Sequence, residues 1–426
     1  MKRRTPLIVT IAMAVMPVGF HAQQSPLLLE RSRIVTLDPG KAWANSVAIV
    51  KAAPVIVNVM DPASKLAGFT MALSGEDVKS LLLDAKEVEK QPHTLHVTIW
   101  VTAASQGTRL FVRAAPNGAG FFAHSTGQVE KEILDAIEKG TIWRSVPDDP
   151  SRLSVSKAPP EAAFKSASGA ALASPRTRLN VSNPDVAVLT CSLMIASSEL
   201  KTFTNGVAQT KGAAQQIYPG AAHLTLWFEP SHEGTTIRSR SLILESGSLS
   251  PVSLPSNGRL ESAVLKAMEE RLGTSPDAVI DIGSDYRGKA AFWTILFGFR
   301  ASDSKRQSGL AAVRELPAPM EHAWQSTLQV VTQSQVIVEA DRLTGVLGFI
   351  AAHTSETGTK YSLHKVELVL AATDFGTRLT ISIPDTQETA EESERELKAI
   401  AERIGTELFL RERLTWLTKK KKEGAK

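Results

Sequence analysis

The chain has 426 residues, of which 43% are hydrophobic, 22% charged and 6% aromatic. This length exceeds one typical core and predicts about two to four domains, and the apolar content excludes wholesale disorder. The formal net charge of +4 lies at the two ends, because residues 1–22 carry +3 and residues 419–426 carry +4. The body between them is therefore acidic, which excludes a basic nucleic-acid surface there.

The N-terminus has the pattern of an export signal. Lys2, Arg3 and Arg4 form a basic start, and an uncharged apolar segment over residues 6–20 precedes Ala22. This order predicts a signal peptide at residues 1–22, and hence a periplasmic or secreted protein. The apolar run is shorter than the ~20 residues that cross a bilayer as a helix, and an uncleaved signal is the only membrane span expected. Because no cysteine lies nearby, we do not expect a lipoprotein.

Cys191 is the only cysteine. A single cysteine excludes an intramolecular disulfide, so the stability of an exported chain must come from packing. Cys191 lies within the apolar run 186–196, which favours a buried thiol that acts as a small hydrophobic side chain over a nucleophile.

The first predicted module covers residues 39–146. Asp38-Pro39-Gly40 is typical of a helix start, and we expect the helix over residues 41–52. Alternating apolar side chains predict strands, which we place at residues 55–59, 66–73, 95–101 and 109–114. A charged helical insert is expected over residues 75–90, and a closing helix carries its apolar face on Val129, Ile133, Leu134 and Ile137.

The next segments are less regular. Residues 147–176 are rich in Pro, Ser and Ala with few large apolar side chains, which predicts a linker. The second module, residues 177–275, is diverged: it has an alternating strand at Leu224, Leu226 and Phe228 and a closing helix that Gly273 ends. Its first half aligns convincingly with neither of the other modules. Residues 276–320 are predicted to be a connecting insert, whose apolar decapeptide at residues 290–299 indicates a buried strand.

The third module, residues 321–418, has the clearest pattern. A helix over residues 323–333 precedes strands at 336–340, 345–351, 365–370 and 378–383. The final helix, expected over residues 389–418, begins acidic and ends basic, as the helix dipole favours. At ~1.5 Å per residue it would reach ~45 Å, longer than one small domain, so its end is expected to project or to contact a partner. Residues 419–426 form a basic tail.

The three modules repeat one unit. Each has a strand, a turn that ends in Gly-Thr, a second strand and an amphipathic helix, and the turns are Gly107-Thr108, Gly234-Thr235 and Gly376-Thr377. A period above one hundred residues indicates whole small domains, not the repeats of a solenoid. The predicted fold is therefore α+β, with about three tandem modules of antiparallel β-sheet packed against helices.

This order of elements resembles the helix-grip-type modules of BamC, the lipoprotein subunit of the outer-membrane barrel-assembly machinery, and related periplasmic modules. In the third module the resemblance is carried by Trp324, Asp341, Gly345 and Gly376-Thr377-Arg378. In the first module the matching residues are Trp43, Asp61, Gly68 and Gly107-Thr108-Arg109. The acylated cysteine of such lipoproteins has no counterpart here.

Motifs that would carry chemistry are incomplete. Residues 283–289 have the spacing of a phosphate-binding loop, but Ala290 stands where a Ser or Thr would hold magnesium. Residues 118–123 fit a loose dinucleotide pattern without the βαβ unit that it requires. His93 and His96 are three residues apart on a strand, so they point to opposite faces and cannot share a metal ion. We therefore predict no catalytic residues, no cofactor and no metal.

One surface patch favours binding. Trp416 stands beside Lys419, Lys420, Lys421 and Lys422, a combination that suits an anionic lipid or a cell-wall polymer. The leading hypothesis is an exported, non-enzymatic, multi-module binding or scaffold protein of the cell envelope, whose partner is an unknown envelope protein, polymer or anionic lipid surface. The alternatives are a carrier of an apolar ligand between helix and sheet, or an enzyme with a site in the second module or the insert, at Asp285, Arg287, Lys289 or His223.

Overall fold

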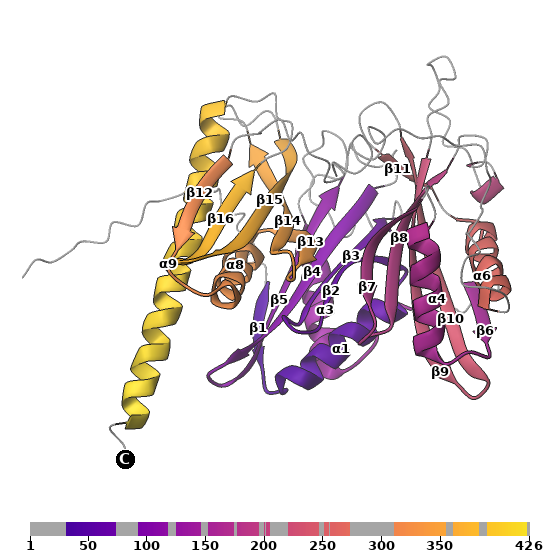
Figure 1. Ribbon diagram of the computed structural model, residues 1–426, viewed down its shortest axis with the longest axis horizontal. Helices are drawn as coiled ribbons and strands as arrows, with labels where there is room; N and C mark the ends of the chain where they lie inside the picture. The colour runs from indigo at the N-terminus through magenta and orange to yellow at the C-terminus, as the bar shows by residue number, and fades with distance from the viewer. Residues whose placement is uncertain are drawn as a thin grey trace, which may run out of the picture.

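The protein consists of three α+β modules in a row, and the first module lies between the third and the second (Figure 1). The structure is a computed structural model, and it describes residues 31–73, 93–117, 125–145, 152–173, 177–195, 200, 202–204, 220–246, 251–254, 256–272, 311–354, 361–382 and 390–423. The predicted signal peptide, the charged insert at 75–90 and the decapeptide at 290–299 lie outside these residues.

Module 1 is a five-stranded antiparallel sheet with two helices on one face. Its strand order is β1-β5-β4-β3-β2. The elements are β1 (Ser32–Val35), α1 (Pro39–Ala52), β2 (Val55–Asp61), β3 (Leu66–Leu73), β4 (His93–Ala104), β5 (Gly107–Asn117) and α3 (Gln128–Lys139). The helix start predicted at Asp38 is confirmed, since its carboxylate accepts the Gly40 and Lys41 N–H groups, each at 2.9 Å. Strand β1 was not predicted, because four residues are too few to show a period.

Module 2 repeats this plan, and here the predicted linker was wrong. The sheet order is β11-β10-β9-β8-β7, with β6 also paired to β10. The elements are β6 (Leu153–Ser156), α4 (Pro160–Ala173), β7 (Thr177–Asn183), β8 (Val188–Ile195), β9 (Gly220–Ser231), β10 (Gly234–Ser246), β11 (Pro251–Leu254) and α6 (Arg259–Leu272).

The predicted linker at residues 147–176 therefore holds the first strand and the first helix of module 2. The linker was predicted from the lack of large apolar side chains. Alanine, however, is a strong helix former, and its small side chain can pack closely against a sheet. Ala163 and Ala167 are buried beside Phe164 against the sheet. The first half of the module, which the sequence left unaligned, follows the same β-α-β-β order as module 1.

Module 3 has the strand order β12-β16-β15-β14-β13. Its elements are β12 (Ala311–Leu316), α8 (Met320–Ser334), β13 (Val336–Asp341), β14 (Val346–Thr354), β15 (Tyr361–Thr373), β16 (Gly376–Ser382) and α9 (Ala390–Glu423). Strand β12 falls within the segment predicted to be a connecting insert, so module 3 begins earlier than expected. Like β1, it was missed because a short strand shows too little of a period.

The Gly-Thr turns join the first strand of each module to its sheet. Gly107, Gly234 and Gly376 have φ of 133°, 132° and 142°, and a Cβ atom on any of them would lie within 2.3 Å of a first-strand carbonyl oxygen. The following threonine is fully buried, and its hydroxyl donates to the carbonyl of Leu37, Ala158 or Ala318 at 2.6, 2.6 and 2.8 Å. The motif therefore holds the link between first strand and first helix.

The turn between the second and third strands also repeats, although not as predicted. Asp61, Asn183 and Asp341 each accept backbone N–H groups of the turn that follows them. The residues with positive φ in these turns are Lys65, Ala187 and Gly345. Gly345 therefore corresponds to Lys65, and the prediction that paired it with Gly68 was wrong. The register places Gly68 opposite Thr98 and Gly348 opposite Glu367, so Gly68 corresponds to Gly348.

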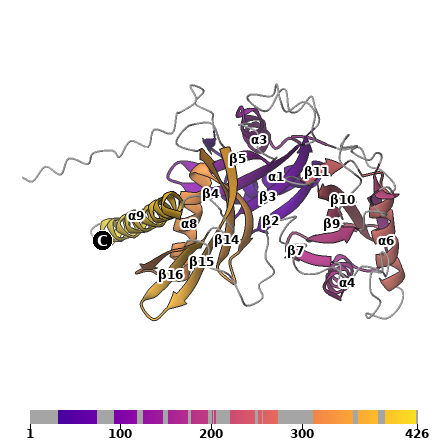
Figure 2. The ribbon, with the colours of Figure 1, turned by 90° about the horizontal axis from the view of Figure 1, so that it is seen from above.

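The modules share their cores. The helices of each module cover the inner face of its sheet, and the opposite, outer face of module 1 packs on module 3 (Figure 2). Trp100 and Phe111 of module 1 belong to the same buried cluster as the core of module 3, and Val188 and Trp227 of module 2 belong to that of module 1. The three modules therefore form one continuous body.

Candidate functional site

The modules meet through one contact that the chain uses twice. The Ile337 N–H of β13 donates to the Thr98 hydroxyl on β4 at 2.7 Å, and this joins module 3 to module 1. The Val57 N–H of β2 donates to the Thr225 hydroxyl on β9 at 3.0 Å, and this joins module 1 to module 2. Val57 and Ile337 both precede the β-bulge of their edge strand, and Thr98 and Thr225 have the same place in their sheets. We call this arrangement the docking contact.

Other side chains complete the docking contact between modules 3 and 1. A Cβ atom on Gly68 would lie 3.0 Å from the Ile337 carbonyl oxygen, so the glycine allows the close approach of β13. The indole N–H groups of Trp100 and Trp324 both donate to Ser64, at 3.1 and 3.0 Å. Arg113 donates from Nε to the Gln333 carbonyl near the end of α8 at 3.0 Å. A cation at a helix C-terminus stabilises that end.

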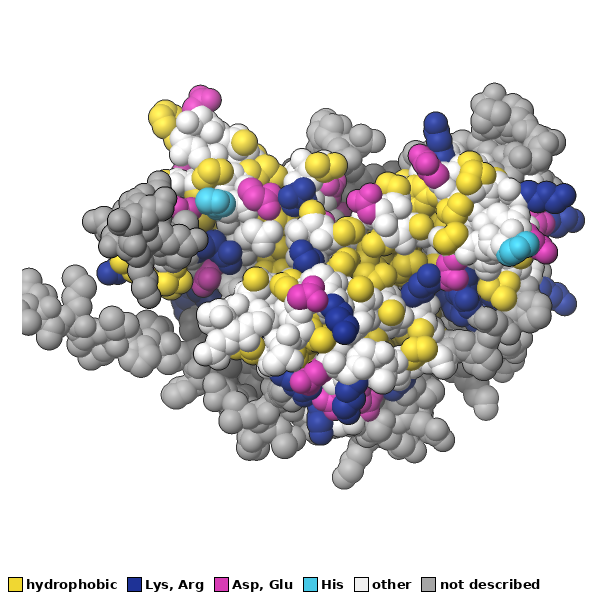
Figure 3. Space-filling model, turned by 90° about the horizontal axis from the view of Figure 1, so that it is seen from below, with side chains coloured by type: hydrophobic (Ala, Val, Ile, Leu, Met, Phe, Trp, Pro, Cys, Tyr) yellow, Lys and Arg dark blue, Asp and Glu magenta, His cyan; other side chains and the backbone are white. Residues whose placement is uncertain are grey.

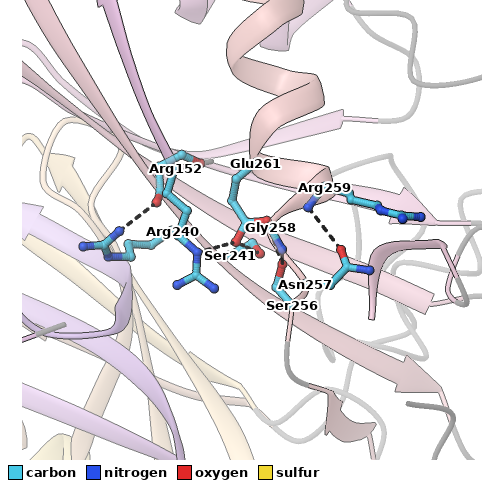
Figure 4. Close-up of polar contacts among 9 residues, drawn as sticks. Arg152, Arg240, Ser241, Ser256, Asn257, Gly258, Arg259 and Glu261 are labelled. Carbon is cyan, nitrogen blue, oxygen red and sulfur yellow. Dashed lines mark hydrogen bonds and ion pairs between the residues drawn. The ribbon is translucent and has the colours of Figure 1, made fainter. Parts of the chain in front are cut away.

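A buried polar network recurs in modules 1 and 2. In module 2, Glu261 of α6 is fully buried and accepts the Ser241 and Ser256 hydroxyls, each at 2.7 Å, and Arg152 Nε lies 3.6 Å from its carboxylate (Figure 4). Arg240 is also buried and donates to the Ser239 carbonyl. The carboxylate is thus held among hydroxyl groups and a cation.

Module 1 has the same residue types at the same positions. Glu130 of α3 is fully buried and accepts the Ser125 hydroxyl at 2.6 Å and the Ala114 N–H at 3.3 Å. Arg113 corresponds to Arg240, and Arg31 corresponds to Arg152, by the register of the paired strands. Burial and the charge of Arg31 lower the pKa of Arg113 to about 10, while Glu130 opposes that shift. At the two Arg positions module 3 has Ala312 and Ser382.

This network was missed in the sequence, although a signal was present. Both closing helices begin with Ser-x-Gly-x, an apolar residue and Glu, as Ser125 to Glu130 and Ser256 to Glu261. The serine hydroxyl accepts the N–H of the glycine and donates to the glutamate, so the motif caps the helix start. Because both carboxylates are engaged within the fold, we interpret the network as structural.

A second polar network also recurs on the outer faces of modules 1 and 2. Asn58 donates to the Thr70 hydroxyl at 2.5 Å, and that hydroxyl lies 2.6 Å from His96 Nδ1. Asn180 donates to Ser192 at 2.5 Å, and Ser192 lies 2.9 Å from His223 Nδ1. The corresponding residues of module 3 are Val338, Ile350 and Lys365.

The two imidazoles are held neutral. Burial lowers the pKa of His96 to about 4, and burial together with the charge of His96 lowers the pKa of His223 to about 3. Within the described residues, no cluster of three or more His, Cys, Asp or Glu side chains could hold a metal ion. His223, one residue of the enzyme alternative, is therefore part of a hydrogen-bonded network. Asp285, Arg287 and Lys289 lie outside the described residues, as do the glycine-rich segments 118–123 and 283–289.

Cys191 lies in the core of module 2, as the sequence predicted. It is buried in β8, and burial raises the pKa of its thiol to about 12. A thiol with so high a pKa stays protonated near neutral pH and is a poor nucleophile.

The long helix α9 extends well beyond the sheet of its own module (Figure 1). Its first half packs through Leu397, Ile400, Ala401, Ile404 and Leu408, all buried. Its second half exposes Phe409, Leu410, Leu414 and Leu417, with Leu414 at 64%. Leu410 follows Leu408 by about 200° around the helix, and spacings of four and three residues place the three leucines on one stripe. That stripe therefore lies opposite the packed face.

The predicted surface residues lie on this projecting end. Trp416 and Lys419, Lys420, Lys421 and Lys422 belong to the last turns of α9, which runs to Glu423. Their side chains are outside the described set. Residues 409–423 contain six basic and two acidic side chains. By contrast, the face in Figure 3 shows Lys, Arg, Asp and Glu interspersed around a central group of hydrophobic side chains.

The comparisons with known proteins assign no family. No family model matches the chain, and no curated protein matches it. Among solved structures, the chain is similar to the crystal structure of the di-domain ARO/CYC StfQ from the steffimycin biosynthetic pathway, at 9% identity over 89% of this chain and 94% of that chain. The TM-score is 0.16, and at that value the similarity carries no argument about this protein. The resemblance to BamC-type modules stays a prediction.

Proposed function

We propose that this protein is a non-enzymatic scaffold of the cell envelope that lies on an anionic lipid surface through the projecting end of α9. The observation that carries the proposal is the exposed leucine stripe at Leu410, Leu414 and Leu417, which runs toward a basic helix end. An amphipathic helix with apolar residues on one side and lysines nearby suits the boundary between lipid headgroups and acyl chains.

A membrane surface fits this helix better than a coiled-coil partner. Coiled coils need apolar positions sustained over three or four heptads. If the spacing of Leu410, Leu414 and Leu417 is continued along the helix, the core positions of the coiled coil before them are Arg403 and Glu407, and the one after them is Lys421. All three are charged. The stripe is thus about one heptad long, which is short for a coiled coil but sufficient for insertion between headgroups. In the described part of the chain, no helix is both long and apolar enough to cross a membrane.

The rest of the molecule supports a scaffold role. The modules share buried clusters, so a surface bound at α9 would carry the other two modules in a set orientation. The recurring polar networks serve helix capping and strand contacts, and their side chains bond to one another.

Co-sedimentation with lipid vesicles tests the proposal. The intact protein is expected to bind vesicles that contain phosphatidylglycerol more tightly than vesicles of phosphatidylcholine alone, and salt should weaken this binding. Leu414→Ser with Leu417→Ser should weaken binding at least ~10-fold, because each leucine loses apolar burial. Lys420→Gln with Lys421→Gln should weaken binding about 30-fold, since each lysine contributes ~1 kcal/mol near an anionic surface.

Matched substitutions serve as controls. Leu343 and Phe375 are each 91% exposed in turns outside α9, so Leu343→Ser with Phe375→Ser removes similar apolar area. Lys131→Gln with Lys139→Gln removes two charges from α3. Both controls should bind vesicles as the parent protein does. Equal binding to both kinds of vesicle, or unchanged binding by the leucine variant, would show the proposal to be wrong.

A further inference from the structure

The docking contact has direction, because one module supplies an edge strand and the other supplies the outer face of its sheet. Module 3 supplies β13 to module 1, and module 1 supplies β2 to module 2. Among the described elements, two halves take part in no such contact: the outer face of module 3 and the edge strand β7 of module 2. A contact of this head-to-tail kind joins two different surfaces, so it builds open chains unless the rotation between copies closes a ring.

The outer face of module 3 keeps the features that accept a strand. Gly348 corresponds to Gly68, which lets a strand carbonyl approach. Glu367 takes the place of Thr98 and Thr225, and the two oxygens of a carboxylate can accept a backbone N–H in addition to the interaction that Glu367 already makes. Thr98 and Thr225 are 1% and 0% exposed, whereas Glu367 is half-buried.

Strand β7 keeps the features that enter such a face. It has the same β-bulge as β2 and β13, between Leu179 and Val181. Leu179 is half-buried, whereas its counterparts Val57 and Ile337 are 0% and 1% exposed. Ser182 is exposed, whereas its counterpart Met60 is 5% exposed.

Module 1 shows that one module can make both contacts at once. Its strand β2 crosses the outer face of module 2 while β13 of module 3 crosses its own outer face beside the same β2 strand. Module 2 receives β2 beside β7 in the same way. With module 1 bound to module 2, β7 therefore lies beside β2 as β2 lies beside β13, so β7 has the same setting as a strand that already makes the docking contact.

We propose that the outer face of the module 3 sheet binds strand β7 from module 2 of a second copy of this chain, so that copies join head to tail. The Leu179 N–H donates to the Glu367 carboxylate, and the carbonyl before the bulge lies over Gly348. Each copy binds one neighbour through its module 3 face and another through its β7 strand, so the assembly lengthens as the protein concentration rises.

Sedimentation velocity and light scattering on the full-length protein, without lipid, test this inference. The average mass of the wild-type protein should rise with concentration past that of a dimer. Gly348→Trp should block the face, and Ser182→Glu should place a charged side chain on the strand at the position whose counterpart, Met60, is buried. Each variant alone should stay monomeric. An equal mixture of the two should form one-to-one dimers and nothing longer, because each supplies the half that the other lacks.

Controls separate the contact from folding and from α9. Leu343→Trp and Val155→Glu place the same side chains at exposed positions elsewhere and should assemble as the wild type does. Thermal unfolding should show both blocked variants to be folded. A monomeric wild type at every concentration, or assembly that persists in both blocked variants, would overturn the inference. Loss of assembly in the Leu414→Ser, Leu417→Ser variant would overturn it too, since it would assign the contact to α9. The vesicle experiment tests the membrane proposal independently of this result.

Discussion

His96 and His223 occupy the same position in modules 1 and 2, and both are buried, hydrogen-bonded imidazoles with a lowered pKa. Each lies on the fourth strand of its module, opposite Thr70 or Ser192. Each imidazole stays neutral near neutral pH, because burial lowers its pKa. The two networks lie near the junction of modules 1 and 2, where β2 contacts β9, and the charge of His96 lowers the pKa of His223.

Acid should therefore weaken the fold through these two residues. Their folded pKa values of about 4 and 3 lie below the ordinary value of 6.5, so the unfolded chain binds more protons between these values. Stability is then full above about pH 6.5 and falls as pH drops toward 4. Urea unfolding at pH 7.5 and pH 5 should show a smaller pH-dependent loss, by about 1–3 kcal/mol, in His96→Gln with His223→Gln than in the wild type.

The other groups of this junction do not mimic that result. Lys51 and Glu229 form an ion pair at 2.9 Å between modules 1 and 2, and Arg238 lies 3.6 Å from Glu229. These charges are retained in the double variant and give the same background in both proteins. His232→Gln, in the turn that joins β9 to β10, is the matched control. An identical pH dependence in the wild type and the double variant would contradict the assignment.

At the scale of elements, the closing helices α3 and α6 depend on a buried carboxylate at their first turn. Glu130 and Glu261 sit where the helix dipole favours a negative charge, and each binds a serine hydroxyl that also accepts an N–H of the helix start. Module 3, which α9 closes, has Ala312 and Ser382 at the positions of the two arginines. The network is thus a property of two modules and not of the repeat.

Glu261→Gln is expected to lower the free energy of unfolding by about 1–3 kcal/mol. The amide keeps the shape of the side chain, but its NH2 group faces one of the two serine hydroxyls where a carboxylate oxygen had accepted a hydrogen bond. The substitution also removes the negative charge near Arg152. Chemical denaturation of the full-length protein measures the change. Glu161→Gln, on an exposed glutamate in the first turn of α4, should change stability much less. Equal effects of the two substitutions would show that burial of the carboxylate does not matter.

At the scale of the molecule, the modules behave as one body because the docking contact buries backbone groups that need partners. The Ile337 N–H has the Thr98 hydroxyl as its acceptor, and that hydroxyl donates back to the Ile337 carbonyl at 3.2 Å. Trp100 and Trp324 both bond to Ser64 beside it. Modules joined in this way should unfold together.

Thr98→Val should break that coupling. The valine matches the shape of threonine but leaves the buried Ile337 N–H without its acceptor, which costs about 1–3 kcal/mol. Calorimetry should show one transition in the wild type, and in the variant a lower melting temperature with module 3 lost first. Thr102→Val, on the same strand and half-buried, is the control. A variant that melts as the wild type does would contradict the role given to Thr98.

The sequence by itself determined the elements whose pattern is local. The Gly-Thr turns, the alternating strands of modules 1 and 3 and the apolar stripes of the closing helices were all readable, because each follows from a backbone conformation or a period. The α+β class followed from their order.

Only the tertiary structure decided how distant residues meet. The short first strands carry no period and are defined by their pairing with the Gly-Thr strand, more than 60 residues away. The linker at 147–176 became part of module 2 because its alanines pack on a sheet formed later in the chain. The docking contact joins Thr98 to Ile337 and Val57 to Thr225, and no local pattern marks it, since a threonine hydroxyl has a partner only when another module brings one.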